Sequence, residues 1–165
     1  MQKSTKTIVS KYFLIIIFLL LLAVFFVSFN LKSKNISPVP SAAEKQLQIE
    51  TSSKIVTINV EIAKTEAELT QGLSNRKSID QNSGMYFELG QRAVTSFWMK
   101  EMLFPLDIIW IDNGTIVGIE KNAPIPTSAT IPTFHSPTEV TNVLEVNAGF
   151  STQNKINPGD TIVLR

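Results

Sequence analysis

Residues 107–119 read DIIWIDNGTIVGI, and this stretch decides the fold class. Two runs rich in β-branched residues, Asp107–Ile111 and Thr115–Ile119, flank the dipeptide Asn113-Gly114. Asn-Gly is the strongest short-range signal for a β-hairpin, because both residues readily adopt the positive φ angles of a two-residue turn. The stretch therefore predicts two antiparallel strands joined by a tight turn.

Further strands are predicted on both sides of this hairpin, because apolar residues either alternate with polar ones or form short runs. These strands cover residues 55–62, 84–89, 95–100, 143–146 and 161–164. Residues 148–155 could form one or two helical turns. The four prolines of residues 122–138 indicate a long irregular loop.

One short helix is predicted after the first of these strands. Thr65 is followed three positions later by Glu68, which is the spacing of a capping box at a helix start. Leu69 and Leu73 share one face, and Gly72 permits close approach to a neighbouring element. The predicted fold class is α+β and strand-dominated, a small barrel-like antiparallel or mixed sheet with one short helix.

A membrane anchor is predicted before this domain. Residues 12–29 read YFLIIIFLLLLAVFFVSF and contain no charge. As a helix they would measure about 27 Å, close to the roughly 30 Å of a bilayer core. Lysines at positions 3, 6 and 11 favour a cytoplasmic N-terminus, residues 1–11. We expect a single-pass protein of the cell membrane with an extracytoplasmic C-terminal domain; the alternative is a signal peptide cleaved near Ala43.

The rest of the chain divides into a linker and one globular domain. Residues 30–54 are rich in Ser, Pro, Lys, Gln and Asn and show no hydrophobic periodicity, so we predict a flexible linker. The globular domain is predicted to cover residues 55–165. Residues 50–165 hold nine Lys and Arg against 13 Asp and Glu, a formal charge of −4. Such a domain is a poor partner for phosphate backbones, so nucleic acid is not expected as a ligand.

Composition also limits the chemistry. Cysteine is absent, which excludes disulfides, a thiol nucleophile and zinc–thiolate sites. With one histidine, His135, and no clustered acids, no metal site is predicted. None of the seven glycines lies in a phosphate-binding loop pattern, and no cofactor is expected.

The segment Phe97-Trp98-Met99-Lys100-Glu101-Met102, followed by Pro105-Leu106-Asp107-Ile108, resembles the signature of the domain of unknown function 192 family. The resemblance covers about residues 56–165 and includes Gly72-Leu73 with Arg76, Gly84-Met85 with Phe87, and Leu144-Glu145. It implies a compact, mostly β domain that is often exported behind an N-terminal signal or anchor. It implies no activity. The family usually has Asn at the position of Glu101, so a role tied to that position is not carried over.

Five residues are candidates for a ligand-binding site: Arg76, Trp98, Lys100, Asp107 and Glu145. Alternation along residues 95–100 places Trp98 and Lys100 on one face. Trp98 could form an apolar wall with Lys100 and Asp107 as polar contacts, and Arg76 could bind a carboxylate or phosphate. The alternative is structural, with Lys100 paired to Asp107 and Arg76 paired to Asp107, Asp112 or Glu145.

Two classes of function follow. The preferred interpretation is a membrane-anchored binding or structural module for a small polar ligand, a glycan, a peptide or another envelope protein. The second is an envelope hydrolase that uses Glu101, Asp107 and Glu145, because glycosidic hydrolysis needs two carboxyl groups about 5–9 Å apart.

Overall fold

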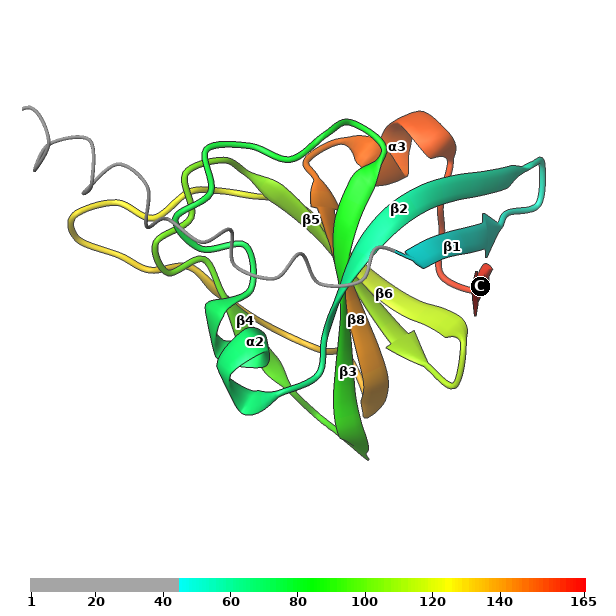
Figure 1. Ribbon diagram of the computed structural model, residues 1–165, viewed down its shortest axis with the longest axis horizontal. Coiled ribbons are helices and arrows are strands. Elements are labelled where there is room, and N and C mark those ends of the chain that lie inside the picture. The colour runs from blue at the N-terminus through cyan, green and yellow to red at the C-terminus, as the bar shows by residue number, and fades with distance from the viewer. Residues whose placement is uncertain (1–44) are drawn as a thin grey trace, which may run out of the picture. The chain divides into compact units, whose positions relative to one another are not determined.

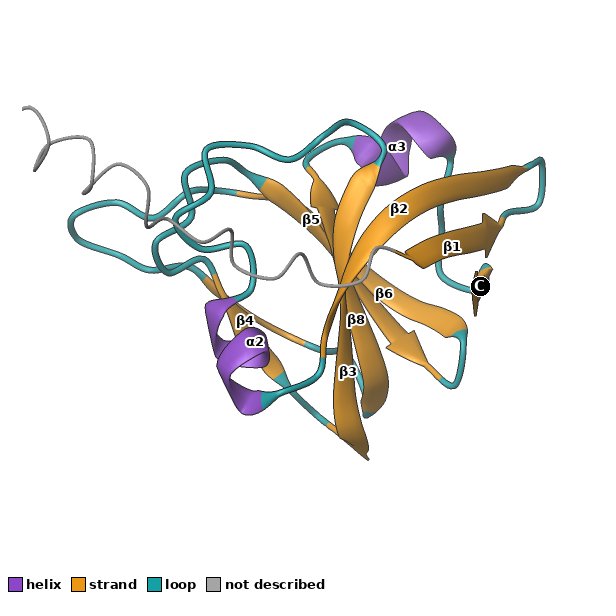
Figure 2. Cartoon of the chain, viewed as in Figure 1, coloured by secondary structure: helices purple, strands orange, loops and turns teal. Residues whose placement is uncertain are grey.

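The computed structural model of this protein describes residues 45–165, in which nine strands and two short helices form (Figures 1 and 2). The strands are β1 (Lys45–Glu50), β2 (Ile55–Ala63), β3 (Ser83–Ala93), β4 (Ser96–Trp98), β5 (Leu106–Asp112), β6 (Thr115–Ala123), β7 (Thr133–His135), β8 (Val140–Asn147) and β9 (Thr161–Leu164). The helices are α2 (Glu66–Gln71) and α3 (Phe150–Asn154). The predicted α+β, strand-dominated class is confirmed, and the second short helix, α3, lies within residues 148–155, where one or two helical turns were expected as possible.

Seven strands close into a barrel in the order β1-β2-β3-β8-β5-β6-β9, and β9 pairs back onto β1. Neighbouring strands are antiparallel except β2 and β3, which are parallel. The remaining strands, β4 and β7, form a separate two-stranded ribbon. The predicted hairpin is the β5–β6 pair, in which Asn113 and Gly114 have φ angles of 48° and 79°.

The barrel strands separate two apolar clusters. Ile109 and Ile111 of β5 belong to the cluster that fills the barrel together with residues from each of the other barrel strands. Ile108 and Trp110, which alternate with them, belong to a second cluster on the outer face of the sheet. Strand β5 is therefore buried on both faces, which explains why its sequence is an almost continuous apolar run.

The outer cluster is covered by α2 and by the β4–β7 ribbon, which lie on the same side of the barrel (Figure 1). Helix α2 begins as predicted, because Thr65 Oγ1 accepts a hydrogen bond from Glu68 N while the Glu68 carboxylate accepts one from Thr65 N. The helix belongs to residues 64–82, the crossover that connects the parallel strands β2 and β3. Leu73, just after the helix, is fully buried against the sheet.

Two predicted loops contain strands. Strand β1 lies inside residues 30–54, which were predicted as a linker, so the folded domain begins by Lys45 and not at residue 55. Leu47 and Ile49 have no exposed surface, but two apolar residues are too short an alternation to stand out in a polar segment. Strand β7 lies inside the predicted irregular loop 122–138 and pairs with β4.

The predicted membrane segment, residues 12–29, lies outside the described residues, as do residues 1–11. Within residues 45–165, no helix has the length and apolar character needed to span a membrane.

Candidate ligand-binding site

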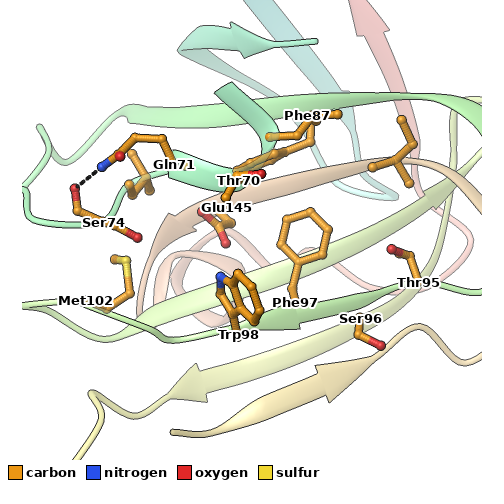
Figure 3. Close-up of a pocket in the computed structure, with 14 residues that line it drawn as sticks. Thr70, Gln71, Ser74, Phe87, Thr95, Ser96, Phe97, Trp98, Met102 and Glu145 are labelled. Atoms are coloured by element: carbon orange, nitrogen blue, oxygen red, sulfur yellow. Dashed lines mark hydrogen bonds between the residues drawn. The ribbon is translucent and has the colours of Figure 1, made fainter. Parts of the chain in front are cut away.

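A cavity of about 290 Å³ lies on the outer face of the barrel, between α2 with its following loop and strand β4 (Figure 3). Its walls are mostly apolar. Their apolar side chains are Leu69, Leu73, Phe87, Leu89, Phe97, Trp98 and Met102. Thr70, Ser74, Thr95 and Ser96 add hydroxyl groups. This combination of an apolar wall with a few polar groups is typical of small-molecule sites.

Glu145 of β8 lines this cavity (Figure 3). Its neighbours Leu144 and Val146 belong to the barrel interior, so alternation places Glu145 on the outer face. There it lies opposite Met85 of β3 and Ile108 of β5, both members of the outer apolar cluster. Glu145 is only 5% exposed, and its carboxyl group has no hydrogen-bond or ion-pair partner among residues 45–165.

Burial without a partner changes the protonation of this carboxyl group. Removing it from water penalises the charged form, and this desolvation raises the pKa of Glu145 from its ordinary value of 4.5 to about 8. The group is therefore mostly protonated at neutral pH. In that form it can donate a hydrogen bond, and it can give up its proton when a positive charge enters the cavity.

The aromatic side chains beside Glu145 are held by edge-to-face contacts. The Phe97 ring lies 4.9 Å from Phe87 and 5.7 Å from Trp110, with interplanar angles of 87° and 86°. Such contacts favour one orientation of the central ring. Trp98 is 51% exposed, and Lys100 Nζ lies 5.9 Å from the centre of its ring. Figure 3 shows Trp98 below the Glu145 carboxyl group and the Phe97 ring directed toward Phe87.

Hydrogen bonds connect the two sides of the cavity. Ser74 Oγ donates to the Lys100 carbonyl oxygen at 2.9 Å, and Asn75 Nδ2 donates to Glu101 Oε2 at 2.8 Å. Asn75 N also donates to the Glu101 carbonyl oxygen at 2.9 Å. The loop after α2 is thus bonded to the loop after β4, which fixes the spacing of the two walls.

Gly72 allows α2 to approach the buried acid. A Cβ atom at this position would lie 3.3 Å from Phe87 Cζ and 3.8 Å from Glu145 Oε2. The φ angle of Gly72 is also positive, at 48°, a conformation that other residues rarely adopt. The sequence predicted a close approach to a neighbouring element at Gly72, and that neighbour is the pair Phe87 and Glu145.

Asp107, a predicted site residue, lies elsewhere and has no exposed surface. Its Oδ1 accepts hydrogen bonds from Asn122 N at 2.9 Å and Gly149 N at 3.0 Å, and its Oδ2 accepts one from Ser151 N at 2.9 Å. It therefore ties β5 to the end of β6 and to the start of α3. The predicted pairing of Asp107 with Lys100 is not what the structure shows.

Arg76 is also separate from the Glu145 cavity. Its guanidinium group forms a two-pronged ion pair with Glu61 of β2, in which Nη2 lies 2.8 Å from Oε2. This pair raises the pKa of Arg76 and lowers the pKa of Glu61. The partners named from sequence, Asp107, Asp112 and Glu145, are wrong. Both residues line a different, polar cavity of about 220 Å³ that also contains Asp80.

The structure does not bring together the three carboxylates of the hydrolase interpretation. Glu101 is exposed and bonded to Asn75, and Asp107 is occupied by backbone amides. In the described part of the chain, Glu145 is the only ionisable side chain that lines the cavity. His135 is exposed, as expected, and its Nδ1 shares a cross-strand hydrogen bond of 2.8 Å with Ser96 Oγ.

The sequence pointed to Trp98 and Glu145, which do line one cavity, but it missed Phe87, Phe97 and the side chains of α2. The Phe97 side chain was assigned to the opposite face from Trp98. It nevertheless lines the same cavity, where its ring packs edge to face against Phe87. The signal that could have revealed the contribution of α2 was Gly72, a glycine beside an apolar helix face.

A closed barrel with a helix and a two-stranded ribbon covering one outer face defines the class of this domain, a capped β-barrel with a cavity under its cap. The chain belongs to the DUF192 family, whose model, described as "Uncharacterized ACR", matches residues 47–164. None of the curated proteins matches the chain significantly.

Two solved structures are similar to it. One is a crystal structure of a protein from Sinorhizobium meliloti 1021, described as a candidate transcription regulator. That structure has a TM-score of 0.71 and 31% identity, and the match covers 75% of this chain and 95% of the other. The second is a protein of unknown function from Novosphingobium aromaticivorans DSM 12444. It has a TM-score of 0.71 and 26% identity, and the match covers 78% and 90% of the two chains.

Proposed function

We propose that this protein is a membrane-anchored binding module that holds a small ligand in the cavity between α2 and β4. Residues 12–29 would anchor it in the cytoplasmic membrane, with the barrel on the extracytoplasmic side. The observation that carries the proposal is the Glu145 carboxyl group. It lies in an aromatic-lined cavity and has no partner among residues 45–165.

Energetics support this interpretation. A largely buried polar group without a protein partner costs free energy, and a bound molecule is one explanation for such a group. Among residues 45–165, Ser151 Oγ is the only fully enclosed side-chain polar atom without a hydrogen bond, so the Glu145 oxygen atoms still face the cavity space. A purely structural acid would be expected to resemble Asp107, which satisfies both of its oxygen atoms with backbone amides. Glu145 instead leaves its carboxyl group directed at a space that a ligand can occupy.

A role in DNA binding, suggested by the description of the Sinorhizobium relative, receives no support from charge. Residues 50–165 carry a formal charge of −4, which opposes contact with phosphate backbones. The hydrolase alternative lacks a second carboxylate in the cavity among the described residues. Binding therefore remains the function that the cavity supports best.

The binding proposal is tested with a cavity-blocking variant. Thr70 is exposed, lines the cavity and forms no side-chain hydrogen bond within residues 45–165, so Thr70→Phe should fill the entrance without unfolding the chain. Ala67→Phe, on the same helix but not at the cavity, is the matched control. We would screen a set of small fragments against the full chain in a non-ionic detergent, using the NMR signal of the Trp98 indole N–H.

Fragments that bind should shift this signal in the wild type and in Ala67→Phe but not in Thr70→Phe. A screen without any such fragment would contradict the proposal, as would fragments that bind the blocked variant equally well.

The anchor is tested by deleting residues 12–29. The full chain should sediment with membranes and resist alkaline extraction, because 18 apolar residues suffice to span a bilayer core. The deletion variant should be recovered in the soluble fraction. A phosphatase fused after Arg165 should be active only if the barrel is extracytoplasmic. An inactive but intact fusion would contradict the orientation.

A further inference from the structure

The chemistry of the cavity walls limits which ligand can satisfy Glu145. The side-chain hydroxyl of Ser74 is already donated to Lys100, and Ser96 is bonded to His135. The amide of Gln71 donates to the Ser74 carbonyl oxygen at 3.1 Å. The hydroxyls of Thr70 and Thr95 have no side-chain hydrogen bond within residues 45–165, but they are neutral and suit any polar ligand. The features that distinguish the cavity are therefore a carboxyl group without a partner and the surfaces of aromatic rings.

Both of these features attract positive charge. The face of an aromatic ring carries partial negative charge and binds ammonium groups, most strongly where water is excluded. A desolvated carboxylate is stabilised by a cation at close range. Lys100, whose ammonium group lies 5.9 Å from the Trp98 ring, already shows that one ring at the rim accepts a cation.

We propose that the cavity binds an organic cation whose primary or methylated ammonium group pairs with Glu145 and packs against Phe87, Phe97 and Trp98. This rests on the binding function proposed above and adds the chemical class of the ligand. An anionic ligand could only share the proton of Glu145 and would be repelled once the carboxyl group ionises, and a neutral ligand would gain no ion pair. The cavity, at about 290 Å³, is at the small end of ligand sites, which suits a headgroup-sized cation.

The pH dependence of cation binding should come from Glu145, because the other charged side chains near the cavity are occupied elsewhere. On α2, Glu68 is occupied by its capping hydrogen bonds with Lys64 and Thr65. On β5, Asp107 is bonded to backbone amides, and Glu88 of β3 lies at a different cavity with Tyr86 and Arg92. After β4, Lys100 lies over Trp98 and Glu101 is bonded to Asn75. None of these lines the Glu145 cavity.

Binding of a cation should therefore displace the proton from Glu145. At pH 6 to 7 each bound cation should release close to one proton, because the carboxyl group is mostly protonated there when the cavity is empty. Affinity should rise as pH increases from 6 to 9 and then level off. This pH profile separates the proposal from simple apolar binding, which would be independent of pH.

The experiment compares two probes of the same shape. Choline carries a quaternary ammonium group, and 3,3-dimethyl-1-butanol replaces its nitrogen by carbon and is neutral. Binding of each, and of n-butylammonium, would be measured by calorimetry with the full chain in a non-ionic detergent. Thr70→Phe corrects for partition of the alcohol into the micelle. Glu145→Gln preserves the shape of the protonated acid but cannot ionise.

We expect choline or n-butylammonium to bind the wild type at least about tenfold more tightly than the alcohol, and Glu145→Gln to abolish this preference. Equal affinity for choline and the alcohol, or a preference that survives Glu145→Gln, would overturn the inference. If the alcohol or other neutral fragments bind and Thr70→Phe blocks them, the binding function stands and only the cation is wrong. If no fragment binds at all, the binding function itself fails.

Discussion

Asp107 and Ser151 are 44 positions apart in the chain, yet Asp107 Oδ2 accepts a hydrogen bond from Ser151 N at 2.9 Å. The same carboxylate bonds Gly149 N and Asn122 N, so it organises the first turn of α3 and the end of β6. A residue that looked like a ligand contact in the sequence thus joins three segments of the fold.

Asp107→Asn should destabilise the protein strongly. The NH₂ group of asparagine cannot accept a hydrogen bond, so at least one of the backbone N–H groups would lose its partner. We expect the free energy of unfolding to fall by about 3 kcal/mol. Denaturant unfolding measures this loss. Asp112→Asn, on the same strand but at an exposed ion pair with Arg92, is the control and should cost clearly less. Equal effects of the two substitutions would contradict the structural role of Asp107.

The stability of the protein should depend on pH through Glu145. Its pKa is raised from 4.5 to about 8 in the folded chain, so the folded state holds the proton more tightly than the unfolded state. The contribution of Glu145 to the free energy of unfolding is then largest at acidic pH and falls between about pH 5 and 8, by up to about 1.4 kcal/mol per pH unit. Above pH 8 this contribution is lost and the profile levels off.

The Glu145→Gln variant isolates this effect. Because glutamine does not titrate, the difference in unfolding free energy between variant and wild type should grow from pH 5 to pH 8 in favour of the variant. Parallel pH profiles for the two proteins would show that Glu145 is not desolvated as described.

Gly118 of β6 should not tolerate a side chain. A Cβ atom there would lie 2.8 Å from Pro137 Cγ and 3.3 Å from Trp110 Cδ1. Gly118→Ala should therefore cost about 1–3 kcal/mol through overpacking. Adding Pro137→Ala removes the ring atoms that clash, so the double variant should recover part of this loss. Additive losses in the double variant would show that Pro137 is not the obstacle.

Glu101 occupies a backbone conformation that suits other residues better. Its φ angle is 59°, in the left-handed region, where Asn is favoured and β-branched residues are strained. Glu101→Asn should leave thermal stability unchanged or raise it, whereas Glu101→Val should lower stability by about 1–2 kcal/mol. Thermal melts of the two variants decide this. A valine variant as stable as the asparagine variant would contradict the assigned conformation.

The features that sequence predicts well are those encoded by neighbouring residues. The turn at Asn113-Gly114 and the capping box of Thr65 and Glu68 need only local geometry, and both form as expected. Strand β1 has few apolar residues, and its identity depends on pairing with β2 and β9, as when Leu47 lies between Ile58 and Leu164. Such pairing joins the two ends of the domain, and its only local signal is the short alternation of Leu47 and Ile49.

The same limit applies to the site. Charged residues could be selected as candidates, but the choice among their partners depends on tertiary packing. Arg76 forms an ion pair with Glu61, and Asp107 accepts hydrogen bonds from backbone amides. Glu145 has no partner in the described part of the chain. Alternation placed Trp98 and Lys100 on one face, and Lys100 Nζ does lie 5.9 Å from the centre of the Trp98 ring. It could not place the helix that forms the opposite wall of the cavity.

The number of strands in the barrel has a consequence for where this cavity lies. Strand direction reverses at every antiparallel pair, so a closed ring must contain an even number of such reversals. The ring of residues 45–165 has seven strands and therefore cannot close with antiparallel pairs alone. The parallel pair β2–β3 resolves this parity, but a tight turn cannot join parallel strands. Residues 64–82 must cross the outside of the ring to make the connection, and they bring α2 over the sheet beside Glu145. The odd number of strands thus accounts for the crossover segment, residues 64–82, under which the cavity lies.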